Sequence, residues 1–421
     1  MIQTKKQYIN KMSTYLFTHK AIDCVGCSVC MKICAHSAIT MAEDSEGFLY
    51  PKVDTEKCVD CGLCQKLCPL ENNTEITDEN KHAYIVVNAE ETYFGKSATV
   101  GVCTMLAHFV INHGGIVYGV ELNENNWTAS HKCADSLERW DSLRNSKYLQ
   151  SDTKDSFSEV KRHLKSGRFV MYVGTGCQIA GLRSYLRYDY DNLLTVDLIC
   201  HGVFSHKMMK KEVEYWERIY EGKLSNFHFR NKKLTTGGVV DFDIQKHGRI
   251  KHYTHFAQFS PVYRLFTAHG DGLSYNLRPS CYSCQFRGKG RYGDITLGDP
   301  WGTRNLYPHL NTPELTKNGI GMVIVNTIKG QKHIDSVKLC AQFNEIKVDD
   351  VYKQPALIPQ DERIPQERSV FYNSLDMEDL GELVERELHI DFVSLRRNYL
   401  IKKKYDQIKK IIKNTLKTIY Q

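Results

Sequence analysis

The chain reads C-V-G-C-S-V-C-M-K-I-C at residues 24–34 and, after 23 further residues, C-V-D-C-G-L-C-Q-K-L-C-P at residues 58–69. Both stretches have the spacing C-x2-C-x2-C-x3-C, and Pro69 ends the second. Four thiolates bind one iron–sulfur cluster, and this doubled spacing is typical of bacterial two-cluster ferredoxins. The stretch therefore predicts a ferredoxin-like module with two [4Fe–4S] clusters.

The spacing also divides the eight cysteines into two ligand sets. In this arrangement three thiolates of a run face one cluster, and the fourth reaches the cluster of the other run. We name the sets the inner set (Cys24, Cys27, Cys30 and Cys68) and the outer set (Cys58, Cys61, Cys64 and Cys34). Zinc sites use two Cys pairs instead of two four-Cys runs, and disulfides require an exported chain. Ala35 follows Cys34 where Pro is usual, which alters the loop but removes no ligand.

Length and composition indicate a globular protein of two or three domains. The 421 residues are 42% hydrophobic and 25% charged. The first residues, M-I-Q-T-K-K-Q-Y-I-N-K-M, lack the apolar segment of a signal peptide, and no apolar run approaches the roughly 20 residues that span a bilayer. Fifteen cysteines without an export signal indicate metal ligation in a reducing compartment, so we expect a cytoplasmic location.

The net charge of +7 is concentrated near the end of the sequence. Residues 396–421 hold nine Lys or Arg and one acid, Asp406, so the other 395 residues have a net charge of −1. The bulk of the chain therefore has no basic character that indicates nucleic-acid binding. Apolar residues recur at steps of three and four from residue 401, which predicts a basic amphipathic helix over 395–421. Such a helix suits packing on the protein's own body, peripheral contact with an anionic membrane, or an acidic partner.

Strand and helix patterns alternate after residue 81, which predicts an α/β sheet with some parallel pairing. We expect strands at 82–88, 116–122, 128–134, 169–173, 193–199 and 319–328, helices at 101–112, 157–165 and 332–342, and antiparallel strands within 225–256. Between the two Cys runs we expect a short hairpin with its turn at Gly47.

Four more cysteines form a third set (Cys177, Cys200, Cys281 and Cys284). Cys177 and Cys200 each follow an apolar strand pattern, and the other two form a C-x2-C pair. A four-thiolate site results only if the fold brings these segments together. The alternative is that they are buried structural cysteines, which are common. Cys103, Cys133 and Cys340 are expected to be ordinary apolar residues.

Five stretches resemble the coenzyme F-420 hydrogenase/dehydrogenase beta-subunit family, in a form fused to an N-terminal two-cluster ferredoxin. They are S-A-T-V-G-V-C-T near 97, R-N-S-K-Y-L-Q-S at 144–151, V-G-T-G-C-Q-I-A-G-L at 173–182, D-L-I-C-H-G-V at 197–203, and R-P-S-C-Y-S-C-Q-F with R-Y-G-D-I-T-L-G-D-P-W-G at 278–302. The resemblance spans roughly residues 20–305 in the same order.

The resemblance implies FAD and a [4Fe–4S] cluster held by the third set. Two departures affect its motifs: Val100-Gly101 replaces a tandem Gly, and Gly176 replaces the Pro that usually precedes the cluster Cys. The implied fold class is an α+β ferredoxin-like dicluster module followed by an α/β flavin and iron–sulfur domain. The expected parts are an N-terminal arm (1–20), the ferredoxin domain (21–75), a linker (76–81), the catalytic domain (82–305), its C-terminal extension (306–394) and the basic helix (395–421).

Two segments are expected to bind the flavin. The turn with Ser97, Thr99 and Gly101 precedes a helix, where backbone N–H groups suit a phosphate, although a plain helix cap explains the same residues. The loop at 144–151 supplies Lys147, Tyr148 and Gln150 through the resemblance. A Lys147 cation near the flavin ring would stabilise its reduced anion; the alternative is a solvated surface lysine.

Three further features near the cysteines have competing interpretations. His201 follows Cys200, and it either donates a proton to a substrate near the flavin or only hydrogen-bonds near the cluster. G-T-G-C-Q-I-A resembles a dinucleotide loop with Asp197 about 20 residues on, but Ile179 stands where the third Gly belongs. Asp294 and Asp299 are expected to brace loops.

The function that follows is an iron–sulfur flavin-dependent oxidoreductase. It would pass electrons between a ferredoxin-type carrier and a two-electron organic acceptor or donor, such as deazaflavin coenzyme F-420, through [4Fe–4S] clusters and FAD. The alternative is a non-catalytic electron-transfer subunit that docks on a partner redox enzyme. Nothing in the sequence indicates the oligomeric state.

Overall fold

The computed structural model describes residues 21–72, 75–76, 81–231, 238–267, 274–358 and 364–399. The expected N-terminal arm and residues 400–421 of the expected basic helix lie outside these ranges. The final described segment, 392–399, is helical, which includes the described part (395–399) of the expected basic helix.

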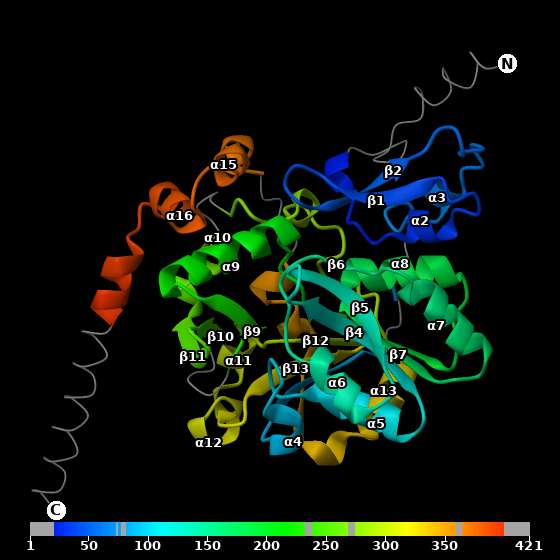
Figure 1. The fold of residues 1–421 in the computed structure, drawn as a ribbon. Coiled ribbons are helices and arrows are strands. Elements are labelled where there is room, and N and C mark those ends of the chain that lie inside the picture. Colours follow the sequence, from blue (N-terminus) through cyan, green and yellow to red (C-terminus); the bar gives the residue numbers. More distant parts are fainter. Residues whose placement is uncertain are drawn as a thin grey trace, which may run out of the picture.

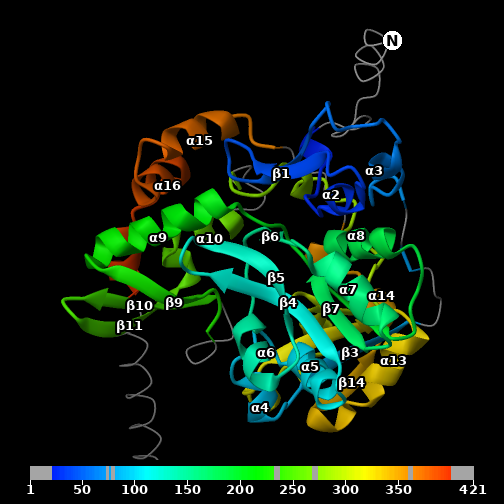
Figure 2. The same cartoon turned by 45° about the vertical axis from the view of Figure 1, so that its right-hand side comes forward.

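The two Cys runs flank a hairpin, as the sequence predicts. β1 (Ile39–Glu43) pairs antiparallel with β2 (Leu49–Val53), and Gly47 in the turn has a φ of 83°. The short helices η1 (Ala21–Asp23), α2 (Val29–Ile33) and α3 (Leu63–Lys66) complete this module. It lies on top of the rest of the molecule, with α2 packed on α8 (Gly176–Leu186) (Figures 1 and 2).

A nine-stranded mixed sheet forms the centre of the remaining chain, which we call the body. Its order is β14-β3-β13-β12-β8-β7-β4-β5-β6, and β4, β7, β8 and β12 run parallel. The strands are β3 (His82–Val87), β4 (Ile116–Asn123), β5 (Thr128–Ala134), β6 (Ser151–Asp152), β7 (Val170–Thr175), β8 (Leu193–Leu198), β12 (Ile295–Gly298), β13 (Ile320–Val325) and β14 (Gln342–Ile346). The expected sheet with parallel pairing is confirmed.

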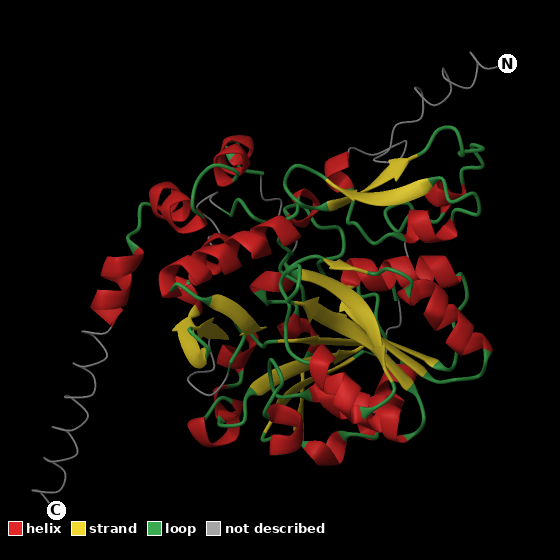
Figure 3. Ribbon diagram, in the orientation of Figure 1, coloured by secondary structure: helices red, strands yellow, loops and turns green. Residues whose placement is uncertain are grey.

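Helices cover both faces of this sheet (Figure 3). Successive strand residues point to opposite faces, so Val117 of β4 packs with one helix layer and Tyr118 with the other. One layer contains α5 (Val102–Asn112), α6 (Leu137–Leu143) and α13 (Ile328–Asp335), and the other contains α7 (Ser156–Lys165) and α8. Because both faces are covered, β7 and β13 are apolar along nearly their whole length.

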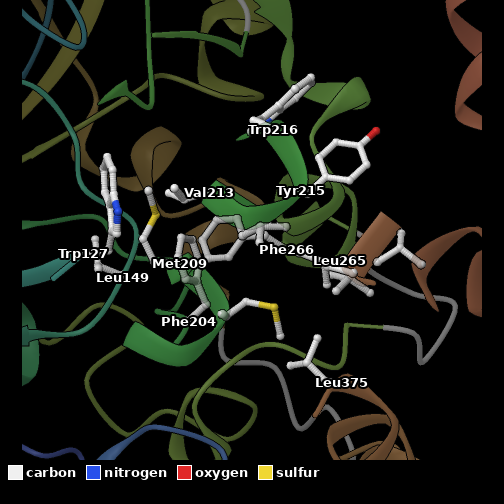
Figure 4. Close-up of a cluster of buried hydrophobic side chains, with 14 of the residues drawn as sticks. Trp127, Leu149, Phe204, Met209, Val213, Tyr215, Trp216, Leu265, Phe266 and Leu375 are labelled. Atoms are coloured by element: carbon white, nitrogen blue, oxygen red, sulfur yellow. The ribbon is translucent and has the colours of Figure 1, made fainter. Parts of the chain in front are cut away.

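A second core lies beside the central sheet. The antiparallel strands β9 (Lys223–His228), β10 (Val239–Lys246) and β11 (Arg249–Phe256) face helices α9 (His206–Tyr220), α10 (Pro261–Thr267), α15 (Arg368–Leu375) and α16 (Leu380–Leu388). Trp216, Phe266 and Leu375 belong to this core, and Figure 4 shows their side chains converging from different elements. The region supports α15, which reaches the ferredoxin hairpin.

Short elements complete the body, and one expected element is wrong. They are α4 (Glu91–Phe94), η2 (Ala257–Phe259), η3 (Pro279–Cys281), α11 (Thr303–Leu306), η4 (Pro308–Leu310), α12 (Pro313–Thr316), η5 (Lys338–Cys340), α14 (Val348–Val351) and η6 (Pro355–Leu357). The helix expected at 332–342 instead begins at Ile328, because the Thr327 side chain accepts a hydrogen bond from Gly330 N, and it ends at Asp335. Residues 342–346 form β14, since their backbone pairs with the exposed edge of β3.

Polar contacts fix the ferredoxin module to the body. Among the described residues, the ion pairs Lys32–Asp155 and Glu46–Arg368, each at 2.6 Å, cross the junction, and Glu43 Oε1 lies 3.3 Å from His206 Nδ1. Ile76, in the expected linker, forms a backbone bridge with Arg291. Among the described helices, none has both the length and the apolar character needed to cross a membrane.

Candidate functional site: three groups of thiols

The two Cys runs share one local backbone geometry. Gly26 and Asp60, each just before the second Cys of its run, have left-handed φ values of 67° and 56°. Ser28 and Gly62, each just after that Cys, have φ values of 64° and 69°. Glycine adopts this region without steric cost, and Asp and Ser adopt it less readily. The repeated turns curl each loop, so the cysteines that surround them are gathered into a compact group.

The inner set lies in the interior of the molecule. Its four residues are 3–7% exposed. Burial raises the pKa of Cys24 and, strongly, of Cys27 and Cys30, and charge interactions with Cys68 raise each of them further. The fourth Cys of the second run is therefore grouped with the first run, the exchange that the spacing predicts.

The outer set lies nearer the surface, where Cys61 is exposed and the other three members are partly exposed. Burial raises the pKa of Cys64 to about 11, and charge interactions with Cys58 and Cys61 add to the rise. Cys34 Sγ accepts a hydrogen bond from Ala38 N at 3.3 Å, and Cys34 packs beside Cys64 in one apolar cluster.

The fold also brings the third set together. Cys177 is the second residue of α8, which starts directly after β7, and Cys200 follows β8; these neighbouring parallel strands end at the same edge of the sheet. Burial raises the pKa of Cys177 to about 12 and that of Cys281 to about 11, and their interactions with Cys284 contribute. The pKa of Cys200 is also raised, by burial and then by the charges of the other three.

Inner and third sets lie next to each other. Cys27, Cys177 and Cys284 belong to one apolar cluster with Phe286. A Cβ placed on Gly181 of α8 would lie 3.2 Å from Cys27 Sγ, so even a methyl group there would press against the inner set. Among the described residues, no three His, Cys, Asp or Glu side chains are grouped closely enough for a single metal ion. Four thiolates are the usual ligands of one [4Fe–4S] cluster, and each set supplies four thiols.

The expected phosphate turn is held by internal contacts. The Ser97 hydroxyl donates to Tyr93 O at 2.5 Å and accepts from Arg144 at 3.3 Å. Gly101 has a φ of 97°, and a Cβ there would collide with the backbone of Tyr93. Thr99 alone of the three expected residues lines a hollow, so the turn contacts that space through Thr99.

This hollow has an empty volume of about 480 Å³, part of it open solvent. It is lined by Phe94, Ala98, Thr99, Arg230, Asp299, Pro300, Trp301, Arg304, Lys317, Gly319 and Ile320. Arg230 pairs with Asp299 at 2.7 Å, and the Arg304 guanidinium lies 4.8 Å from the centre of the Trp301 ring. Arg304 and Lys317 add positive charge, so the hollow suits an anion attached to a flat ring.

The three residues of the 144–151 loop that were expected to bind the flavin lie in three different environments. Lys147 Nζ donates to the carbonyls of Leu143 and Arg144 at the end of α6, and burial lowers its pKa to about 7. Tyr148 packs among aromatic rings of the second core. Gln150 is 4% exposed, and its Oε1 accepts from Leu49 N of the ferredoxin hairpin at 3.0 Å. Of the three, none lines the hollow.

The remaining expected residues lie close to the third set. Arg287 Nη2 donates to His201 O at 2.9 Å and lies 3.1 Å from His201 Nδ1. The fully buried Asp197 binds Arg291 at 3.0 Å. Its carboxylate is therefore engaged inside the body, whereas a dinucleotide loop would need it at the ribose of the ligand. Asp294 accepts from Thr195 N at 2.8 Å and so braces a loop.

Sequence reasoning missed one residue at this junction. Arg278 is buried, and its Nε donates to Cys24 O at 2.7 Å although the two residues are 254 positions apart. The only sequence signal is its place three residues before Cys281, inside a stretch already quoted for its cysteines.

Comparisons with known families agree with this geometry. Residues 23–72 match the model of the 4Fe-4S dicluster domain, and residues 167–351 match the model for the C terminus of the coenzyme F420 hydrogenase/dehydrogenase beta subunit. Residues 167–351, a little under half of the chain, are thus similar to that beta-subunit family. The chain thus joins a dicluster domain, which binds 4Fe–4S clusters, to a beta-subunit-type segment, and it is an iron–sulfur redox protein. The residues that match the beta-subunit model run to 351. The resemblance seen in the sequence alone ended near residue 305.

Structural comparison finds a chain of a solved structure described as the xenon-derivatised F420-reducing [NiFe] hydrogenase complex from Methanosarcina barkeri. The two chains are 16% identical with a TM-score of 0.39, over 69% of this chain and 89% of that chain. No match is found among curated proteins.

Proposed function

We propose that the chain is an iron–sulfur flavoprotein oxidoreductase that holds three [4Fe–4S] clusters and FAD. The observation that carries the proposal is the convergence of the third set beside the inner set. Segments that are far apart in the sequence supply its four thiols, and it lies against the part of the chain whose spacing already indicates clusters. Isolated structural cysteines have no reason to gather in this way.

The donor chemistry fits this assignment for each of the three sets. Each set offers four thiols, which is the usual ligand set of a [4Fe–4S] cluster. In the inner and third sets, burial shields several thiols from water, and bound iron would replace their protons, as metal ligation requires the thiolate. All fifteen cysteines are free, which suits the reducing cytoplasm that we propose as the location.

The flavin is proposed to lie with a phosphate in the hollow near Thr99. The hydroxyl of Thr99 and the cations of Arg304 and Lys317 provide the donors that a pyrophosphate requires, and Trp301 offers a ring face. When bound, clusters carry single electrons and a flavin links them to two-electron transfer. The catalytic role of His201 and the flavin contacts of Ser97, Gly101, Lys147, Tyr148 and Gln150 remain part of the proposal.

Positions of the three sets suggest how the chain orders electron transfer. The outer set lies near the surface, where Cys61 and the 50%-exposed Val59 can meet a carrier such as a ferredoxin. The inner set follows, then the third set within the body. The chain therefore separates the entry point for single electrons from the site of the organic acceptor, for which we propose a deazaflavin or a similar compound.

The exposed outer set also favours a second candidate, a non-catalytic subunit that docks on a partner redox enzyme. Anaerobically purified chain should contain FAD and reduce or oxidise a small organic acceptor by itself if the first proposal holds. A chain that exchanges electrons with a ferredoxin but turns over no acceptor without a partner would favour the docking subunit. A chain without bound flavin would contradict the oxidoreductase proposal.

A further inference from the structure

Arg278 lies between the inner and third sets. It is 1% exposed, and its three donor groups all hold the ferredoxin junction. Nε donates to Cys24 O at 2.7 Å, Nη1 to Gln150 Oε1 at 3.1 Å and Nη2 to Leu49 O at 3.0 Å. The guanidinium also lies 4.2 Å from the centre of the Tyr50 ring. On the body side, the Arg278 carbonyl accepts from Cys281 N, so the residue contacts both sets directly.

The charge of Arg278 has no carboxylate partner among the described residues. Four arginines of that part of the chain are buried, and the other three each pair with a carboxylate. These pairs are Arg144–Asp141 at 2.9 Å, Arg291–Asp197 at 3.0 Å and Arg368–Glu46 at 2.6 Å. A buried cation is costly unless an anion compensates it. Arg278 meets only neutral oxygen acceptors and aromatic rings, so its counter-charge must come from another kind of group.

The nearby thiols can supply this counter-charge. The Arg278 guanidinium donates to Cys24 O at 2.7 Å, so the cation lies beside the first thiol of the inner set. The Arg278 carbonyl accepts from Cys281 N at 2.8 Å, so the same residue also lies beside the third set. Thiolates of the inner and third sets therefore share one cation, which lies within the electrostatic reach of both.

We propose that Arg278 is a positioning residue that raises the reduction potentials at both the inner and the third set and keeps the two sets in register. This inference rests on the proposed function, because it assumes a cluster at each set. Adding one electron increases the negative charge at a set by one unit, so a fixed cation favours the reduced state. The outer set, which has no contact with Arg278, keeps its own potential. The shared cation thus keeps electron exchange between the two sets close to balance.

The test uses the full chain, purified anaerobically, with potentials measured by redox titration and electron paramagnetic resonance. Arg278→Gln removes the charge, and Gln150→Glu places a carboxylate 3.1 Å from the guanidinium while keeping the shape of the side chain. Gln150 Nε2 has no hydrogen-bond partner among the described atoms, so replacing it by oxygen breaks no contact. Arg278→Lys keeps the charge. Arg368→Gln is the matched control, since it removes a buried arginine of the same junction that pairs with Glu46.

We expect Arg278→Gln and Gln150→Glu to lower the one-electron equilibrium constants for reduction at the inner and third sets by about tenfold, which is 59 mV for a one-electron couple. Arg278→Lys and Arg368→Gln should leave the equilibrium constants at the inner and third sets within a factor of about three of those of the unaltered chain. In all four variants the equilibrium constant at the outer set should stay within the same factor. Signals are assigned with Cys177→Ala and Cys58→Ala.

Unchanged potentials in Gln150→Glu and Arg278→Gln, with the iron retained, would overturn the proposal. If Arg278→Gln fails to assemble, Gln150→Glu decides the question, because it alters only charge. A chain without the third cluster would show about eight irons and no signal lost in Cys177→Ala, which contradicts the proposed function separately. The shift at the inner set would then still test the role of Arg278.

Discussion

The Lys147 ammonium is shielded from water at the end of α6, where it donates to two backbone carbonyls. Burial lowers its pKa from 10.5 to about 7. Between pH 7 and about 10.5 the unfolded chain therefore binds a proton that the folded chain has lost. The contribution of Lys147 to the free energy of unfolding therefore rises with pH over this window. Below pH 7 this contribution is constant, because Lys147 is protonated in both states.

Lys147→Met should remove this contribution. We subtract the thermal unfolding midpoint of the variant from that of the unaltered chain and expect this difference to be larger at pH 9.5 than at pH 7. The reason is that the buried ammonium destabilises the folded state, and this penalty is lost when the lysine is deprotonated. Unfolding measured anaerobically at both pH values tests this. An equal difference between the two proteins at both values would show that Lys147 is not desolvated.

Single residues also show how far the sequence alone can predict this site. Eight of the twelve cysteines proposed as ligands could be predicted from their spacing, which is a local property, whereas the assignment of the third set came from the family resemblance. Arg278 and Gln150 act across 254 and 101 positions, so their roles depend on docking that no local pattern records. The Ser97–Gly101 turn was predicted from its hydroxyls, but that of Ser97 is used inside the turn and only Thr99 faces the hollow.

At the scale of elements, α8 is the surface on which the ferredoxin module rests. Gly181 brings its backbone against Cys27, so a large side chain there must displace the inner loop. Gly181→Leu should lower the iron content by about four atoms per chain, because the inner set can no longer close around a cluster. Iron analysis after anaerobic purification measures this loss.

Gly114→Asn is the control for that substitution. Gly114 has a φ of 77°, nothing lies within 4 Å of a Cβ built there, and Asn tolerates the left-handed region. Its iron content should equal that of the unaltered chain. Full iron content in Gly181→Leu as well would mean that α8 does not constrain the inner set.

The β1–β2 hairpin is held against α15 by Glu46 and Arg368. The arginine is 5% exposed and the carboxylate 17%, so Glu46→Gln leaves a buried guanidinium without its partner. We expect a loss of about 3 kcal/mol in the stability of this junction. This loss should appear as a lower unfolding midpoint of Glu46→Gln, measured anaerobically. The control is the exposed pair Lys57–Asp54, for which Asp54→Asn should have little effect. Equal midpoints for both variants would contradict this account of the junction.

Elements were predicted best where the pattern is long and local. Strand and helix patterns around β3, α5, β5 and α7 agree with the structure within a few residues. The helix expected at 332–342 was extended too far, and the strand Gln342–Ile346 was not predicted, because its strand form is selected by the free edge of β3, which lies more than 250 residues earlier in the sequence. The short strand β12 was missed because four residues between glycines carry little periodicity.

At the scale of the whole molecule, the three thiol sets form a series from the surface into the body. The module at the surface and the sheet of the body are joined by α8, Arg278 and the ion pairs of the junction. This joint brings Cys27 of the inner set into one apolar cluster with Cys177 and Cys284 of the third set. The central claim is that the third set is a cluster site.

The most direct test counts iron in the anaerobically purified full chain and in Cys200→Ala. Cys200 lies in the third set and has no contact with the ferredoxin module in the described contacts. The account predicts about twelve irons per chain for the unaltered protein and about eight for the variant, with the two ferredoxin signals retained. About eight irons in both proteins would contradict it.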